Sequence, residues 1–369
     1  MEEKEKILAV FADGGGLSYT DSILTQLQTQ FNVDIVADQE GKAKETLAKR
    51  GIPCTEMQFP LNEYSLVLCG TNGKARTLQR NITHSARLLG VKVVWLEDLS
   101  GTAILSYALG AEPRLEFVHP DHICFFSSGS RWMYFASEPG LRYRGGSSVI
   151  GNPSFDVIPA QRTTLLERRK AVREKHGIGD DEEVLVYLAS SSEQFNLWED
   201  SLEPIVARAV ARGARLVARL HPADPRKAEL EGRVREKAGA LLISAPLDQA
   251  EAEAIGDVAF TDYSTVGFRT ALLGVVTLFN LSGPSTKRYL EKDGLANPYF
   301  PIFRRGKIPP LALGVFEQSG LIESLDAAFD NASLRSELQQ AYSYPEYAEM
   351  ADGGAGGRAL DEINRLIFD

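Results

Sequence analysis

The sequence has little histidine and cysteine, and this scarcity narrows the chemistry that the chain can perform. It contains five histidines and three cysteines in 369 residues, and Cys54, Cys69 and Cys124 lack the CxxC spacing of a metal or redox site. The GxSxG, Walker A and HExxH motifs are also missing, so a serine hydrolase of the nucleophile-elbow type, a P-loop site or a zincin active site is not expected. Each cysteine adjoins an apolar run, which predicts reduced, buried thiols and no metal site.

Long hydrophobic runs are missing as well. No apolar stretch approaches the ~20 residues needed to span a bilayer, and the N-terminal run of about six is too short for a signal-peptide core. The net charge is −10 and no block of Lys and Arg stands out, so nucleic acid is not an expected partner. We expect a cytoplasmic protein without a transmembrane segment, for which peripheral membrane contact and oligomer formation stay open.

What the sequence does contain is a regular alternation of short apolar runs and helical stretches. The first strands are predicted at Ile7–Ala12, Val33–Ala37, Leu66–Cys69, Val91–Leu96, His122–Phe126 and Ser148–Ile150. A second series is predicted at Val184–Leu188, Leu216–Leu220, Ala240–Ile243, Val258–Thr261 and Val275–Phe279. Because these strands are apolar throughout, they favour parallel sheets that are covered on both faces, as in doubly wound α/β domains.

The segment Gly151-Asn152-Pro153 interrupts this alternation and predicts a domain boundary. We expect residues 1–152 to form an N-terminal Rossmann-like domain and residues 153–345 to form a C-terminal one. Residues 346–369 are expected to form a C-terminal helix that could cross back to the first domain.

Two polar side chains stand at the end of one strand in the second half. Arg219 and His221 close strand Leu216–Leu220, and as alternate residues they can share one face. Ligands of open α/β sheets bind outside the carboxyl ends of the strands, and a guanidinium beside an imidazole suits phosphate or ribose oxygens. A strand end followed by the turn-forming Pro222 explains the same residues without a ligand.

The next strand runs into Thr261–Thr265, where hydroxyl residues begin a predicted helix over Val266–Leu273. Backbone amides and two hydroxyls at a helix N-terminus form an anion site, although an ordinary Ser or Thr N-cap is the alternative. This N-cap stands at the carboxyl end of its strand, one βα unit after Arg219 and His221. The predicted phosphate site therefore consists of Arg219, His221, Asp262, Ser264 and Thr265.

These stretches resemble the C-terminal domain of the CDP-glycerol glycerophosphotransferases, which make teichoic-acid-type polymers. The family pattern is an Arg-x-His-Pro strand end and then Thr-Asp-Tyr-Ser-Ser at a helix start, and here the matching runs are Arg219–Pro222 and Thr261–Thr265. That family shares its fold with the UDP-N-acetylglucosamine 2-epimerases. The resemblance implies a GT-B fold, with two Rossmann-like domains facing each other across a cleft. It also implies that Ser264 and Thr265 hold the donor's pyrophosphate with His221 beside it.

The N-terminal half departs from that family at the position of the general base. After strand Val91–Leu96, where the glycerophosphotransferases carry His-Gly-Thr-Pro, this chain has Glu97 and Asp98 and no histidine. Either carboxylate can deprotonate an acceptor hydroxyl that lies within hydrogen-bond reach, and Asp13 is a third candidate. A solvated loop or a helix cap is the plain alternative for Glu97 and Asp98.

A glycine run follows the first strand and precedes a helix whose N-cap is expected near Ser18 or Thr20. Glycines permit close backbone approach, which makes Gly14 and Gly15 candidate nucleotide contacts. The run does not fit GxGxxG, because position 19 is tyrosine, so a nicotinamide dinucleotide is not expected. A tight βα turn without a ligand fits the same residues.

Three functions are compatible with these patterns. The first is a transferase that moves a glycosyl or polyol-phosphate group from a CDP- or UDP-linked donor to a hydroxyl acceptor, in cell-envelope or surface-glycan synthesis and without a further cofactor. The second is a UDP-sugar 2-epimerase or hydrolase on the same fold. The third is a non-catalytic GT-B module that binds a nucleotide or a partner protein.

Overall fold

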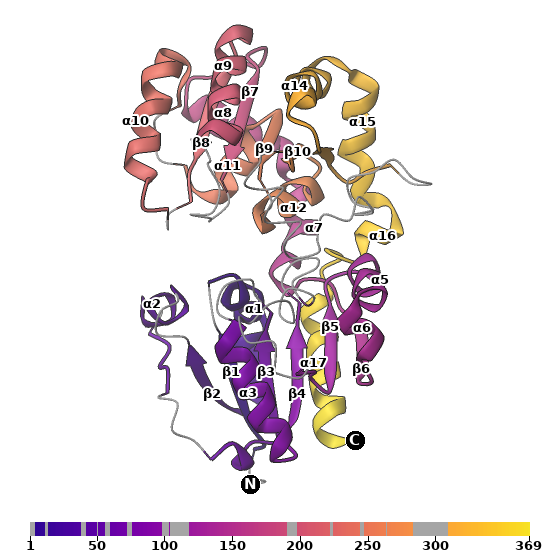
Figure 1. Cartoon of the computed structure of the whole chain (residues 1–369). Helices are drawn as coiled ribbons and strands as arrows, with labels where there is room; N and C mark the ends of the chain where they lie inside the picture. The colour runs from indigo at the N-terminus through magenta and orange to yellow at the C-terminus, as the bar shows by residue number, and fades with distance from the viewer. Residues whose placement is uncertain are drawn as a thin grey trace. The chain divides into compact units, whose positions relative to one another are not determined.

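The chain forms two compact units, which are Met1–Val157 with Ala348–Asp369, and Ile158–Tyr347. Each unit contains one parallel sheet between layers of helices (Figure 1). The computed structural model describes the chain outside residues 1–3, 12–13, 38–41, 50, 56–59, 72–75, 98–102, 104–117, 190–197, 222–223, 244–246, 263 and 283–308. Among the described helices, none combines the length and the apolar character needed to cross a membrane.

The sheet of the first unit has six strands in the order β2-β1-β3-β4-β5-β6, all parallel. Its strands are β1 Lys6–Phe11, β2 Asn32–Ala37, β3 Leu66–Gly70, β4 Lys92–Leu96, β5 His122–Phe125 and β6 Gly146–Val149. These strands confirm the six predicted in the first half, with ends shifted by one or two residues. β1, β3, β4 and β5 are almost entirely buried, as expected for strands that are apolar on both faces. In the edge strand β2 only Ile35 and Val36 are buried.

Helices cover both faces of this sheet. They are α1 Gly14–Gln30, α2 Lys42–Lys49, α3 Arg76–Leu88, α5 Ser128–Ala136, α6 Glu138–Arg142 and α17 Ala355–Phe368, with short 3-10 turns at Leu61–Glu63 and Pro153–Phe155. Leu8 and Val10 of β1 pack on the face of α3 and α5, whereas Ile7 packs on the face of α1 and α17. This alternation follows from the two-residue period of a strand.

The start of α1 differs from the prediction. The helix begins at Gly14 and not near Ser18 or Thr20, so Gly14 and Gly15 belong to its first turn and not to a long loop. Glycine has a low intrinsic helix propensity, which is why the sequence alone suggested a later start. Burial of Leu17 against the sheet provides the packing that overrides this propensity.

The C-terminal segment returns to the first unit and is anchored there. Asp156 accepts hydrogen bonds from the amides of Ala355 and Gly356 at 2.9 and 2.8 Å, which caps the N-terminus of α17. Arg358 donates to the carbonyl of Ile150. Gly151 has φ +81°, and a Cβ there would lie 2.6 Å from the carbonyl oxygen of Glu349, so this position requires glycine.

The sheet of the second unit has five parallel strands in the order β11-β10-β9-β7-β8. They are β7 Val184–Leu188, β8 Arg215–Arg219, β9 Val258–Thr261, β10 Val276–Asn280 and β11 Leu313–Val315. The chain runs outward from β7 to β8 and then crosses back to β9. Neighbouring β7 and β9 therefore flank the topological switch point of this sheet, where ligands of such folds bind.

One predicted strand of the second unit is wrong. Residues Ala240–Ile243 form a 3-10 turn at Gly239–Leu241 and a single bridge between Leu216 and Leu242. Gly239 has φ +53° and ends the preceding helix, so too few residues remain in extended conformation to pair along β8. Strand β11 was not predicted, because its three residues are too short to show a period.

Helices also cover both faces of the second sheet. They are α7 Ile158–Thr163, α8 Leu165–Lys175, α9 Glu203–Arg212, α10 Lys227–Ala238, α11 Gln249–Ile255, α12 Thr265–Leu272, α14 Leu321–Asp330, α15 Ala332–Gln340 and α16 Pro345–Ala348. Shorter turns are η3 Trp198–Leu202, which is π-helical, Gln318–Gly320 and Ala341–Ser343. Helices α9, α10, α14 and α15 pack together on one face around Leu185, Tyr187 and Phe260.

Candidate functional site

The junction between β9 and α12 is the best-formed part of the predicted phosphate site. Ser264 is the N-cap of α12 with extended backbone angles, and its side chain accepts a hydrogen bond from the amide of Gly267 at 3.4 Å. The amides of Thr265 and Val266 precede the first intrahelical hydrogen bond, as at every helix start. Both residues are partly exposed. Two amides and two hydroxyls therefore meet at the positive end of the helix dipole, the usual composition of an anion site.

Close packing fixes the position of this helix start. A Cβ on Gly267 would lie 2.4 Å from the methyl group of Thr261 and 2.6 Å from the ring of Phe279, so only glycine lets α12 approach β9 and β10 this closely. Thr261 in turn donates from its hydroxyl to the carbonyl of Leu188 at 2.6 Å. The end of β7, the end of β9 and the start of α12 are thus held together.

A buried ion pair holds α12 from its other end. Arg269 of α12 donates to Glu253 of α11 at 2.9 Å, and the Glu253 side chain is completely buried. Burial raises the pKa of Glu253, and Arg269 opposes this shift. Arg269 also contacts Gln161 of α7, so three helices converge behind the predicted anion site.

Arg219 and His221 lie at the same edge of the sheet as α12, two strands away. Leu188 pairs with Arg219 on one side and with Thr261 on the other, so Arg219 stands level with Thr261. At about 4.8 Å per strand the two backbones are about 10 Å apart. The predicted residues therefore gather at one edge, but as two groups separated by the end of β7.

The turn after His221 carries a charge pair of its own. Asp224 accepts from the guanidinium of Arg226 at 2.9 and 3.0 Å, and only 1% of its side chain is exposed. The hydrogen bonds from Arg226 lower the pKa of Asp224, and the nearby His221 contributes to this shift. A fixed guanidinium thus lies one turn beyond the predicted imidazole.

Asp262 has a different environment from the other predicted phosphate ligands. Its carboxylate accepts from the hydroxyls of Tyr187 at 2.7 Å and Ser201 at 2.6 Å, and only 1% of the residue is exposed. Burial together with the Asp262 charge raises the pKa of Tyr187 well above its usual value. Both carboxylate oxygens of Asp262 thus accept hydrogen bonds from side chains inside the protein.

A buried polar network continues from Asp262 and was not predicted from the sequence. Asn280 at the end of β10 donates to Ser201 and to the carbonyl of Asp200, while Ser282 donates to Gln318 at 2.8 Å. The carboxyl ends of β7, β9 and β10 are thereby tied to the π-helical turn η3. Such turns are rare and occur often at functional sites. No local pattern marks Asn280 or Ser201, because each gains its role only from a partner 60 to 80 residues away.

In the first unit, the predicted base Glu97 follows β4 directly. Its side chain is fully buried and accepts from the amides of Ala103 at 3.3 Å and Phe126 at 3.1 Å. A solvated loop is therefore the wrong interpretation of Glu97. Asp98 and Asp13, the other two predicted bases, lie outside the described residues.

The first unit also contains a helix N-terminus of interest, that of α5, and there the carboxylate of Glu349 bonds to the first residue of the helix. Glu349 accepts from the amide of Ser128 at 2.6 Å and from its hydroxyl at 2.9 Å, at the first residue of α5. Ser127 caps the same helix by accepting from the amide of Ser130. This end of α5 is neutralised from within the chain.

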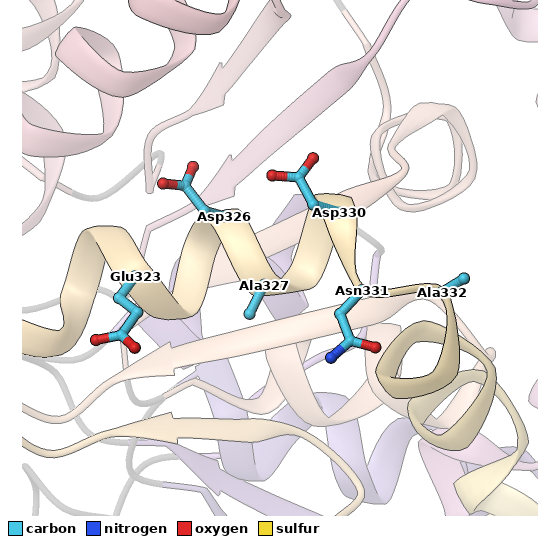
Figure 2. A pocket seen from close by; sticks show the side chains of 6 residues that line it. All are labelled: Glu323, Asp326, Ala327, Asp330, Asn331 and Ala332. Carbon is cyan, nitrogen blue, oxygen red and sulfur yellow. The ribbon is translucent and has the colours of Figure 1, made fainter.

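A broad surface hollow lies over α14 and the start of α15, lined by Glu323, Asp326, Ala327, Asp330, Asn331 and Ala332 (Figure 2). Asp326 and Asp330 project to the same side of the helix, away from Glu323 (Figure 2). Both are paired with Arg212 of α9, at 3.2 and 2.7 Å. Their charges are thus used in holding α14 against α9, far along the chain from the predicted site. Among the described residues, no three His, Cys, Asp or Glu side chains group as a metal site would require.

No protein-family model matches the sequence, and no curated protein matches it. Solved structures do match its fold over almost the whole chain. The UDP-N-acetylglucosamine 2-epimerase of Neisseria meningitidis bound to UDP-GlcNAc superposes with a TM-score of 0.57 at 13% identity, covering 98% of this chain and 100% of that one. A glycosyltransferase of Rickettsia africae gives 0.61 at 11% identity, with 99% of both chains covered.

The wall teichoic acid polymerase TagF, in a structure with CDPG, gives a TM-score of 0.54 at 16% identity and covers 98% of this chain and 88% of that one. These identities are low, so the likeness concerns the fold. Two parallel-sheet α/β units, each with a switch point at its carboxyl edge, and full-length superposition on an epimerase, a glycosyltransferase and a polymerase identify this chain as a GT-B fold protein.

Proposed function

We propose that this protein is a GT-B transferase that binds the phosphates of a nucleotide-activated donor at the start of α12. The observation that carries the proposal is the position of Ser264 and Thr265, which begin α12 at the carboxyl end of β9, beside the switch point between β7 and β9. Ligands of open α/β sheets bind at this place, and anions bind at such helix starts.

The reaction would transfer a glycosyl or polyol-phosphate group to a hydroxyl acceptor. As the donor bond breaks, negative charge grows on the departing nucleotide phosphate, and preorganised amides with a guanidinium stabilise it without a metal ion. Ser264, Thr265 and Arg219 would provide these groups, with His221 beside them. The epimerase and polymerase structures contain UDP-GlcNAc and CDPG, which supports a UDP- or CDP-linked donor.

The group that deprotonates the acceptor would come from the first unit. Glu97 uses its carboxylate to accept two backbone amides, and this favours Asp98 or Asp13 over Glu97 as the base. A general base must reach the proton that it removes, and a carboxylate enclosed at 0% exposure does not meet this requirement.

Thermal shift with CMP, CDP, UDP and GDP tests the phosphate site directly. A nucleotide at a hundredfold excess over its Kd stabilises the folded state by about 2.7 kcal/mol, so one of the four should raise the melting temperature clearly. The Ser264→Ala/Thr265→Ala double variant should lose this shift. No shift with any nucleotide at millimolar concentration would refute the proposal.

A matched control separates loss of binding from loss of a helix cap. Asn331 caps α15 in the same unit by accepting from the amide of Leu334 at 3.0 Å. Asn331→Ala and the double variant should both cost about 1 kcal/mol of stability, but only the double variant should lose the nucleotide response. Equal nucleotide responses in the two variants would remove the start of α12 from the site.

An epimerase or hydrolase is the second candidate, favoured by the full-length superposition on an epimerase that contains UDP-GlcNAc. Such an enzyme would consume or isomerise a sugar nucleotide when no acceptor is present. A transferase would consume its donor only after an acceptor is added. Incubating the chain with UDP- and CDP-linked donors, with and without a panel of hydroxyl acceptors, therefore separates the two reactions.

A non-catalytic module is the third candidate, and the structural role of Glu97 is the observation that favours it. It predicts nucleotide binding without turnover for every donor tested. Turnover that disappears in the Ser264→Ala/Thr265→Ala variant would exclude this candidate.

A further inference from the structure

A buried carboxylate stands two residues before the proposed phosphate site. Asp262 directly follows β9 and precedes Ser264, the N-cap of α12, by two positions. A negative charge so near an anion site opposes the bound anion. Charge alone therefore does not account for an acid at this place, and its contacts suggest a different task.

The end of β9 is held from both faces of the sheet. On one face, Thr261 packs closely against Gly267 of α12, and its hydroxyl oxygen lies 3.4 Å from that of Ser264. On the other face, which α9 and α10 cover, Asp262 is bonded to Tyr187 of the core cluster. Both faces thus contribute contacts that fix the last residues before the N-cap of α12.

Two hydroxyls from different elements hold the Asp262 carboxylate. Tyr187 of β7 donates to one oxygen at 2.7 Å, and Ser201 of η3 donates to the other at 2.6 Å. Both donors are fully buried. A carboxylate with a donor on each oxygen cannot turn about its Cβ–Cγ bond without breaking one of these hydrogen bonds. The direction of the Asp262 side chain is therefore set by β7 and η3.

Asn280 directs the hydroxyl of Ser201 toward Asp262. The side-chain amide of Asn280 donates to the Ser201 oxygen at 3.0 Å and to the carbonyl of Asp200 at 2.7 Å. A serine hydroxyl has a single proton. Because its oxygen accepts from Asn280, Ser201 uses that proton for Asp262. Buried polar networks whose members are satisfied specify one arrangement of a core.

The hydroxyl of Tyr187 has no packing reason to be there. Its ring packs 6.2 Å from that of Phe260 inside the core of the second unit, and phenylalanine would fill the same space without a polar group to satisfy. Burial and the charge of Asp262 raise the pKa of Tyr187 well above its usual value. Tyr187 therefore keeps its proton and remains a donor to Asp262.

We infer that Tyr187 and Ser201 are positioning residues for the donor phosphates and that they act through Asp262. By fixing this carboxylate they set where β9 ends, and hence where the amides at the start of α12 point. Donors that are already in place bind an anion without the cost of reorganising. This inference rests on the proposed function, because it concerns the same site.

Nucleotide affinity of the full chain tests the inference. Isothermal titration calorimetry uses the nucleotide among CMP, CDP, UDP and GDP that binds the wild type most tightly. Tyr187→Phe and Ser201→Ala should each raise its Kd about tenfold, a coupling within the range measured inside one hydrogen-bond network. Circular dichroism melts verify that both variants fold.

Tyr347→Phe is the matched control. Tyr347 is 2% exposed, lies in the same unit and donates its hydroxyl to the carbonyl of Pro309 at 2.9 Å. Removing this hydroxyl should also lower the melting temperature, because a buried hydrogen bond is lost. It should leave nucleotide affinity unchanged.

A double-mutant cycle shows whether the two hydroxyls act through Asp262. Asp262→Ala removes the acceptor that they share, so adding Tyr187→Phe to it should raise the Kd further by less than about twofold, the accuracy to which independent effects add. Independent action would instead multiply the two losses. Asp262→Asn keeps one oxygen acceptor and should recover part of the affinity lost in Asp262→Ala.

Three results would overturn the inference while the proposed phosphate site stands. They are wild-type affinity in both Tyr187→Phe and Ser201→Ala, losses that multiply with that of Asp262→Ala, and tighter binding in Asp262→Ala. The last would mean that the Asp262 charge acts only by repulsion. If the wild type binds none of the four nucleotides, the proposed function fails and the inference fails with it.

Discussion

The carboxyl edges of the two sheets are built from similar parts that are used differently. In the first unit Glu97 follows β4 and accepts from two backbone amides, while Glu349 occupies the start of α5. In the second unit Asp262 follows β9 and accepts from two side-chain hydroxyls, and among the described residues no carboxylate bonds to the start of α12. A carboxylate of the chain itself thus neutralises the start of α5 in the first unit, and this contact has no counterpart among the described residues at the start of α12.

This difference shows that an acidic residue at the end of a strand should be assigned to a site only after its burial and its hydrogen-bond partners are known. Glu97 and Asp262 both stand where a GT-B ligand is expected, and both have carboxylates directed inward. The candidate ligand contacts in the second unit are then amides and hydroxyls, and these groups favour an anion more than a neighbouring carboxylate does.

Replacing Glu97 should have the largest effect. Glu97→Ala leaves the amides of Ala103 and Phe126 buried without an acceptor, and hydrogen bonds to a charged group are among the stronger ones, so we expect a loss of about 3 kcal/mol. Denaturant titration measures this loss. Glu97→Gln should also destabilise, because its NH2 group would face a backbone donor. A Glu97→Gln protein with wild-type stability and no turnover would instead identify Glu97 as the catalytic base.

Replacing Asp262 should have a smaller effect on stability and a distinct effect on the site. Asp262→Ala removes an acceptor from Tyr187 and Ser201, whose hydroxyls can rotate toward other acceptors, and we expect a cost of about 2 kcal/mol. If Asp262 positions the start of α12, nucleotide affinity should fall in Asp262→Ala and recover in part in Asp262→Asn. Unchanged affinity in the folded Ala variant would separate Asp262 from the site.

Replacing Glu349 tests whether its charge stabilises the N-terminus of α5. Glu349→Gln keeps the shape of the side chain but removes its charge from a helix start, which should cost about 1 kcal/mol at low ionic strength and less in high salt. Stability measured in both conditions tests this expectation. A loss that does not depend on salt would point to shape and not charge, and the contrast with α12 would then lose its electrostatic basis.

His119 should make the first unit sensitive to acid. Burial and three arginines lower its folded pKa to about 4 from an ordinary value of 6.5, so the unfolded state binds the proton more readily. Stability is then complete above about pH 6.5 and declines as the pH falls towards 4. Because the ring is half exposed, solvent screening should reduce this effect to less than about 1 kcal/mol.

Hydrogen exchange locates the acid effect. Amides of β5 should lose protection between neutral pH and pH 5 more than those of β7, after correction for intrinsic rates. His119→Asn should remove this difference. An acid-induced loss that is the same in both units, or that persists in the variant, would contradict the assignment to His119.

The strands show how much of the secondary structure the local sequence pattern predicts. Of the eleven strands in the described part of the chain, ten were predicted from apolar runs bounded by polar residues, because a strand buried on both faces leaves a continuous local pattern. The pattern failed at two places, one where a strand was missed and one where a predicted strand is a turn. β11 is too short to show a period, and Ala240–Ile243 is apolar but turns at Gly239. The late start predicted for α1 came from glycine propensity, which packing of Leu17 overrode.

The sequence by itself therefore determined two α/β halves, the GT-B resemblance and the position of Ser264 at a helix start, since each depends on neighbours in the chain. Only the tertiary structure decided which polar side chains are engaged in hydrogen bonds inside the protein. The direction of Glu97 and Asp262 depends on Phe126 and Tyr187, which lie 29 and 75 residues away. A carboxylate accepts hydrogen bonds from whichever donors the fold brings within hydrogen-bonding distance, and the local sequence around the carboxylate does not reveal which donors those are.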